Sequence, residues 1–107
     1  MAFPTYSACF FQGIIPTGTT EQVFVPGGLI WVIRDICYFA VPSTVAGIID
    51  VTDEFARQLF WHMTPAATPD FQHLELRQVI TDSFKATYTG TGSSCSLRVS
   101  GYALNAP

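Results

Sequence analysis

The sequence is poor in charged residues, which make up 12% of its 107 residues, against roughly 25% in an average soluble domain. Its five basic residues are spread singly along the chain, which argues against nucleic acid and anionic membrane surfaces as partners. Hydrophobic residues reach 49% and aromatic residues 14%, a composition that excludes intrinsic disorder. A small folded chain with so little surface charge is expected to bury its apolar surplus against a partner or a second copy.

Long hydrophobic runs are also missing. The longest, Ile36–Val41, has six residues, whereas a membrane-spanning helix needs about 18 or more. The opening MAFPTYSACFFQGII carries no basic residue of the kind that begins a secretory signal peptide. We therefore expect synthesis in the cytoplasm and no membrane partner.

The sequence has only three cysteines, and their spacing matches no known pairing motif. Cys9, Cys37 and Cys95 are far apart and form no C-x-x-C motif, so a zinc site is not indicated. We expect three small buried side chains, although the sequence alone leaves a disulfide in an exported particle open. No cofactor is expected.

Proline and glycine fall in clusters that separate short stretches rich in β-branched and aromatic residues, a pattern typical of an all-β domain. We predict a single domain over residues 1–107, an antiparallel two-sheet β-sandwich of jelly-roll type with about eight strands. The expected strands are Tyr6–Gln12, Gln22–Val25, Leu29–Phe39, Val45–Val51, Arg57–Met63, Gln72–Ile80, Phe84–Tyr88 and Cys95–Leu104.

Two stretches refine this prediction. Leu29–Ile33 is apolar at every position, as in a central strand covered on both faces, and we expect the last strand beside it. Residues 51–60 allow a helical turn, because Phe55 and Leu59 have helical spacing. We favour a turn followed by a strand.

Three residues could bind a metal. If Arg57–Met63 and Gln72–Ile80 formed a hairpin, His62 and His73 could lie opposite each other with Glu75 on the same face. Two histidines align easily by chance, and outward polar positions of a hairpin or a contact between subunits explain these residues better. We predict no metal.

Catalytic motifs are not apparent. The sequence contains no G-x-S-x-G motif, and Gly90–Cys95 resembles a phosphate loop but is followed by neither lysine nor a helix. The neighbours of Cys37 indicate a buried strand rather than a nucleophile. We therefore predict a protein that is not an enzyme and has no catalytic residue.

Charged residues stand where strands should still be packed. Arg34, Asp35, Glu75 and Arg77 are such residues, and we expect them to form ion pairs within or between subunits. Exposed ion pairs contribute only about 0–1 kcal/mol each, so they would orient a contact more than drive it.

Two segments resemble a known family. Val23–Ile36 (VFVPGGLIWVIRDI) resembles the VPAG-x-x-W-V-V-R-D-I segment of small structural proteins of tailed bacteriophages. Leu76–Ile80 and Leu97–Leu104 (LRVSGYAL) resemble the GRQVL…V-x-V-S-G-Y-x-L ending of the same proteins. In this chain Leu76 stands where the family has glycine, and Thr81–Ser83 replaces its Pro-Gly-Glu turn.

The resemblance implies a β-sandwich or jelly-roll component of a virion, made in the bacterial cytoplasm. It would act as a homo-oligomer, with a trimer expected, and bind major capsid or tail proteins. Aromatic side chains are the favoured anchors of such contacts. With the charged residues above, the expected interface comprises Phe3, Tyr6, Phe10, Phe11, Arg34, Asp35, Glu75 and Arg77.

Two alternatives remain open. A carbohydrate- or receptor-binding module of a tail tip would use exposed Trp61 and tyrosine side chains as sugar platforms. A small metal-dependent barrel enzyme would use His62, His73 and Glu75.

Overall fold

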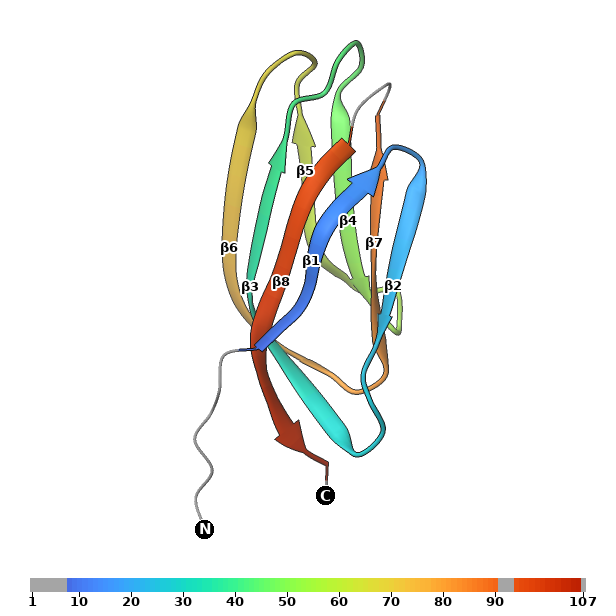
Figure 1. Ribbon diagram of the computed structural model, residues 1–107, viewed down its shortest axis with the longest axis vertical. Coiled ribbons are helices and arrows are strands. Elements are labelled where there is room, and N and C mark those ends of the chain that lie inside the picture. The colour runs from blue at the N-terminus through green and yellow to red at the C-terminus, as the bar shows by residue number, and fades with distance from the viewer. Residues whose placement is uncertain (1–7, 91–93, 107) are drawn as a thin grey trace.

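A computed structural model describes residues 8–90 and 94–106 of the chain. Two antiparallel four-stranded sheets form a sandwich (Figure 1): sheet A has the order β1-β8-β3-β6 and sheet B the order β2-β7-β4-β5. This confirms the predicted fold class. The strands are β1 (Ala8–Pro16), β2 (Thr19–Phe24), β3 (Leu29–Ala40), β4 (Gly47–Asp53), β5 (Gln58–Thr64), β6 (Asp70–Ile80), β7 (Ser83–Thr89) and β8 (Ser94–Asn105).

The strand order is that of a jelly roll. Among the described strands, β4 and β5 are the one pair of chain neighbours that also pair in a sheet, and every other connection passes from one sheet to the other. Two interleaved Greek keys produce this order. The last strand, β8, lies beside central strand β3, as predicted. Within residues 8–90 and 94–106, no helix has the length and apolar character needed to cross a membrane.

The hairpin between Arg57–Met63 and Gln72–Ile80, on which the possible metal set depended, is not formed. β5 and β6 lie at the edges of opposite sheets, so the connection between them crosses the sandwich. β7 and β8 also belong to opposite sheets, and residues 91–93 between them lie outside the described residues. Alternating residues predict a strand and its buried face, but they do not reveal which sheet the strand joins.

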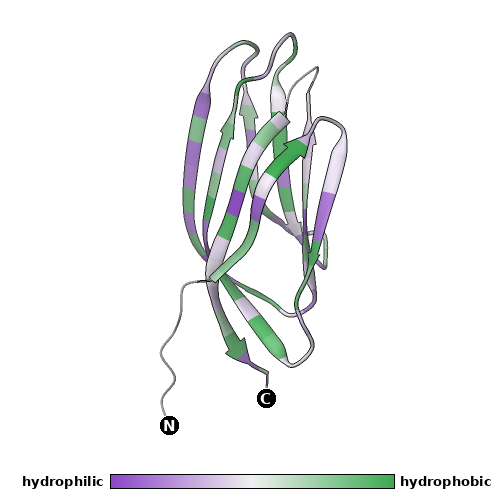
Figure 2. Cartoon of the chain, viewed as in Figure 1, coloured by the Kyte–Doolittle hydropathy of each residue, from purple (hydrophilic) through white to green (hydrophobic). Residues whose placement is uncertain are grey.

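The core lies between the two inner faces. Apolar and polar residues alternate along most strands (Figure 2), so one face of each sheet is apolar. Ile33, Ile36 and Tyr38 of sheet A and Ile49 and Phe84 of sheet B are buried there. Along β7 and β8 every second residue is buried in this way over most of the strand.

The beginning of β3 is covered on both faces, as predicted. Trp31 and Ile33 belong to the core, and the Trp31 ring stacks on Phe10 with a centroid distance of 4.3 Å. Val32 points to the opposite face but is only 4% exposed. A one-residue bulge follows at Arg34, where the register with β8 shifts between Ile33 and Asp35.

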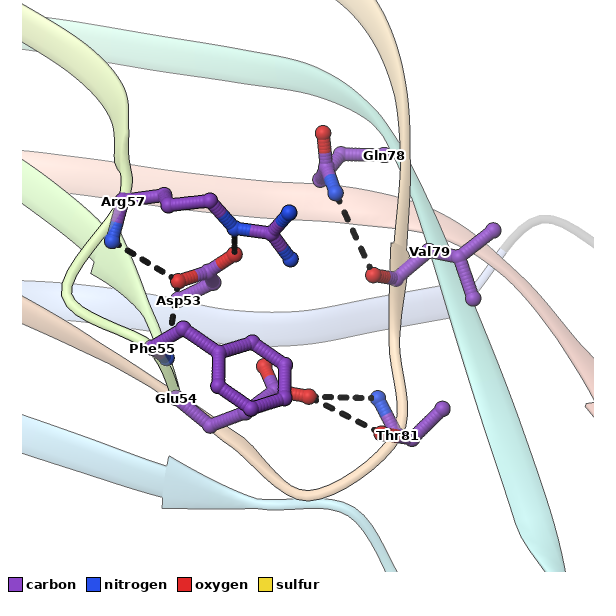
Figure 3. A network of polar contacts seen from close by, with 7 residues as sticks. All are labelled: Asp53, Glu54, Phe55, Arg57, Gln78, Val79 and Thr81. Carbon is purple, nitrogen blue, oxygen red and sulfur yellow. Dashed lines mark hydrogen bonds and ion pairs between the residues drawn. The ribbon is translucent and has the colours of Figure 1, made fainter.

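Asp53 organises the turn between β4 and β5 (Figure 3). Its Oδ1 accepts hydrogen bonds from the backbone N–H groups of Phe55 and Arg57, both at 2.9 Å, and its Oδ2 accepts one from Arg57 Nε at 2.8 Å. Glu54 Oε1 accepts two further bonds from Thr81, in the connection between β6 and β7. The predicted turn followed by a strand is therefore confirmed over residues 51–60.

A polar network connects the facing edge strands β5 and β6. Asp70 accepts hydrogen bonds from Thr64 at 3.3 Å and Gln72 at 2.9 Å, and pairs with His62 at 2.5 Å. The buried Tyr38 hydroxyl bonds to Thr64 at 3.1 Å, and burial raises the pKa of Tyr38 to about 12. His62 thus has a structural partner on the neighbouring edge strand.

Candidate functional site

The outer face of sheet A carries the chain's most regular set of exposed side chains. Along β6 every second residue is exposed: Phe71, His73, Glu75, Arg77 and Val79. Antiparallel pairing places residues of neighbouring strands side by side on this face. The face can therefore be described as rows that run across the four strands.

The first row is apolar. Ile14 of β1 pairs with Ser96 of β8, Ser96 with Phe39 of β3, and Phe39 with Phe71 of β6. Ile14 is 65%, Phe39 43% and Phe71 64% exposed. The small Ser96 between large neighbours leaves a hollow of ≈ 270 Å³, lined in part by all four residues. We call this set the apolar row.

The next two rows form a polar band. Their members are Gln12, Arg98, Cys37 and His73 in one row, and Cys9, Ser100, Asp35 and Glu75 in the other. Asp35 Oδ1 and His73 Nε2 are 2.9 Å apart, and both side chains are about two-fifths exposed (41% and 42%). A second hollow of ≈ 590 Å³ lies over this band beside Arg34 and Tyr102.

A second apolar row follows beyond the polar band. Val32 of β3 pairs with Val79 of β6 and with Tyr102 of β8. Val79 is 50% exposed, and Ile30 and Leu104 pair one step further along. The outer face of sheet A is thus apolar toward both ends and polar between them.

The four predicted charged interface residues come together on this face. Arg34, Asp35, Glu75 and Arg77 line one small depression. Across the described residues, neither arginine forms an ion pair with the two acids, and Asp35 pairs with His73 instead. Ion pairing within the chain is thus not found there, while pairing between subunits stays a prediction.

The proposed metal set is rearranged. His62 lies on β5 in the other sheet and pairs with Asp70, so it cannot join His73 and Glu75. Asp35 takes its place: one ligand atom each from Asp35, His73 and Glu75 lie within 4.8 Å of one another. Arg34 and Arg77 line the same depression as the two acids, and their positive charge opposes binding of a cation there.

The three cysteines differ in exposure, so the prediction that all are buried is wrong. Cys95 is buried, Cys37 is half-buried and Cys9 is exposed. Cys9 and Cys37 lie on the outer face of sheet A. The residue type alone does not reveal this position, because free cysteine is usually buried. Cys37 also lies opposite His73 in the β3–β6 register, but no hydrogen bond joins them in the described part of the chain.

This difference gives a direct chemical test. Burial raises the pKa of the Cys95 thiol to about 12, which keeps it protonated and unreactive. We expect iodoacetamide to modify Cys9 fastest and to leave Cys95 unmodified until the chain unfolds. Peptide mapping by mass spectrometry after native and denatured labelling checks this order. Labelling of Cys95 as fast as Cys9 under native conditions would contradict it.

The predicted aromatic anchors near the N-terminus have a different role where they can be seen. Phe10 and Phe11 are partly buried and pack against the core, next to a register shift between Cys9 and Phe11. They stabilise the sandwich rather than project from it. Phe3 and Tyr6 lie outside the described residues.

The outer face of sheet B offers fewer apolar groups. Trp61 and Met63 of edge strand β5 are 49% and 50% exposed, and Trp61 pairs with Asp50. Tyr38 and Tyr88 are buried, so neither can serve as a sugar platform. Of the described aromatic candidates for that role, Trp61 is the most exposed.

Sequence reasoning missed Ile14, Phe39, Phe71 and Arg98 as surface candidates. Three of them are large apolar residues, which are usually assigned to the core. The signal that could have found Phe71 is its alternation with buried-face residues along β6, which continues through His73 and Glu75. The cross-strand rows themselves depend on register and need the structure.

Proteins similar to this chain are found among solved structures. No family model matches the chain, and no curated protein matches it. Two similar solved structures are of infectious bursal disease virus: the Gt strain (TM-score 0.39, 13% identity, 94% of this chain) and the Gx strain (0.34, 13%, 92%). A third is the capsular polysaccharide assembling protein CapF from Staphylococcus aureus (0.35, 11%, 94%). This chain spans about a third of each (31%, 32% and 29%).

Proposed function

We propose that this chain is a non-enzymatic structural protein of a tailed-bacteriophage virion. It acts as a homo-oligomer that decorates the capsid or attaches to the tail. The observation that carries the proposal is the apolar row, in which three large side chains, Ile14, Phe39 and Phe71, are exposed in one line across a regular sheet face. Exposed apolar patches of this kind mark protein contacts.

The sequence supports the same role independently. The two segments that resemble tailed-phage structural proteins fall on strands β2, β3, β6 and β8, so three of the four strands of sheet A are involved. The low charge content of 12% leaves few groups to keep isolated copies apart. Many copies on a repeated lattice would bind through small contacts that add by multivalency.

Particle composition and solution mass test this function. We expect peptides of this chain at many copies per particle in quantitative mass spectrometry of purified virions. Light scattering over a dilution series should give a multiple of the 11.7 kDa chain mass. Absence from the particles, with a monomer at every concentration, would contradict the proposal.

A glycan-binding module is the second candidate, favoured by half-exposed Trp61 beside Asp50. Binding to a glycan array that Trp61→Ala removes would favour this candidate over the structural role.

A further inference from the structure

We propose that a second copy of this chain docks on the outer face of sheet A. The two faces meet about a twofold axis that runs parallel to the strands, between β3 and β8. The inference rests on the proposed function, because it names the self-contact of the oligomer proposed there. A twofold contact uses the same surface on both copies, so that surface must be complementary to itself.

The strand order makes this face complementary to itself. Rotation about the axis keeps each row at the same height and exchanges the two halves of the sheet. β8 of one copy then faces β3 of the other, and β1 faces β6. Sheets packed face to face lie about 10 Å apart with strands within about 30° of each other, so the central rows remain opposed.

Large side chains then meet small ones in the apolar row. Phe39 of each copy faces Ser96 of the other, where the hollow of ≈ 270 Å³ lies. Ile14 faces Phe71, and both are close to two-thirds exposed (65% and 64%). The contact would fill the hollow and remove the row from water.

Charges are also distributed in a complementary way. The acids Asp35 and Glu75 lie on the β3–β6 half of the polar band, whereas Arg98 lies on the β8 half. After the rotation Asp35 of one copy faces Ser100 of the other copy. It then lies one row from Arg98 of that other copy. Glu75 faces Cys9, so no acid opposes an acid. Arg34 of β3 and Arg77 of β6 then face the end of the β1–β8 half whose described residues carry no charge.

The size of the face suits a specific contact. Four strands span about 19 Å, and β3 from Phe39 to Val32 covers about 23 Å. The projected area is thus about 450 Å² per copy, and surface relief brings the total close to the roughly 1,000 Å² of a specific interface. The outer face of sheet B has no comparable pairing, because Thr20, Gln22, Lys85 and Thr87 occupy most of its β2–β7 half and the exposed Phe24 pairs with the small Ser83.

One pair of matched variants tests the inference. Phe71→Glu places a charge in the apolar row on edge strand β6, and Met63→Glu makes the same change on edge strand β5 of the other sheet. Both positions are at least half exposed (64% and 50%), so both variants should fold. We expect light scattering to show dimers, or multiples of two, for the unchanged chain and for Met63→Glu. Phe71→Glu should raise the dissociation constant by about 100-fold, the loss typical of a large apolar contact residue that carries much of the binding energy.

A second variant covers the case in which Phe71→Glu fails to fold. Ser96→Phe fills the hollow at an exposed position and should also dissociate the pair, while circular dichroism confirms the sandwich. An oligomer that survives both changes but dissociates with Met63→Glu overturns this inference and leaves the proposed function standing. An unchanged chain that forms only trimers also overturns this inference and leaves the proposed function standing, because a closed trimer contains no twofold contact. A monomeric unchanged chain overturns the self-contact, and particle composition then decides the proposed function separately.

Discussion

Gly101→Ala is expected to prevent the chain from reaching its native fold. Gly101 lies on β8 opposite Ile33, beside the bulge of β3. A Cβ atom there would lie 1.9 Å from the Val32 carbonyl oxygen and 3.0 Å from the Arg34 backbone nitrogen. Real Cβ atoms do not approach backbone this closely, and backbone cannot move aside as a flexible side chain can. Relief requires separating the two central strands of sheet A.

The loss should exceed about 4 kcal/mol, a size reserved for changes that break a packed element. Urea unfolding followed by circular dichroism measures it if the variant is soluble. Gly13→Ala is the matched control, since a Cβ there would contact the Phe11 ring at an ordinary 3.4 Å, and its stability should change by less than about 1 kcal/mol. Equal stability of Gly101→Ala and the unchanged chain would show that β3 and β8 do not approach as described.

Asp53→Ala is expected to destabilise the sandwich by about 3 kcal/mol, because three hydrogen bonds to a charged, buried carboxylate are lost. The turn between β4 and β5 would lose the group that accepts hydrogen bonds from the backbone N–H groups of Phe55 and Arg57. Arg57→Ala is the control. It removes one exposed guanidinium but keeps those backbone bonds, and should cost about 1 kcal/mol or less. Chemical denaturation of the three proteins gives the comparison.

The same carboxylate makes stability depend on pH. Burial alone would raise the pKa of Asp53, but hydrogen bonds from the backbone of Arg57 and Phe55, with the Arg57 side chain, outweigh it and hold the pKa below 3.8. The native state therefore binds this proton less readily than the unfolded state, and the stabilisation is present above pH 3.8. This stabilisation is lost as the pH falls from 3.8 through the lowered pKa of Asp53 in the native state. The stability gap between Asp53→Asn and the unchanged chain should close there; a constant gap down to pH 2 would contradict this.

Local patterns were enough to predict the strands, but of their pairings only that of the last strand with the central strand was predicted. The range Phe84–Tyr88 was predicted as a strand, and its Phe84, Ala86 and Tyr88 form a buried inner face; the apolar run Leu29–Ile33 correctly identified the central strand. Both signals depend on burial of neighbouring residues in one strand. The false hairpin between β5 and β6 arose because short connections can join strands of one sheet or of two facing sheets, and residue type does not distinguish the cases.

The candidate site shows the same limit. Arg34, Asp35, Glu75 and Arg77 were identified as residues that stand together, and they line one depression. Ile14 and Phe71 were missed because they are far apart in sequence and join one row only through the register of β1, β8, β3 and β6. The bulge at Arg34 also sets which residues of β3 face outward, and nothing in its sequence marks it.

The jelly-roll order also determines how the chain must fold. Apart from the β4–β5 pair, each described strand finds its sheet neighbours across long stretches of sequence, so loop-closure entropy is spent before those pairings stabilise anything. Chains dominated by such distant pairings fold in milliseconds to seconds rather than microseconds. During that interval the apolar strands of many newly made copies remain exposed together, and folding competes with aggregation in the cell that makes them.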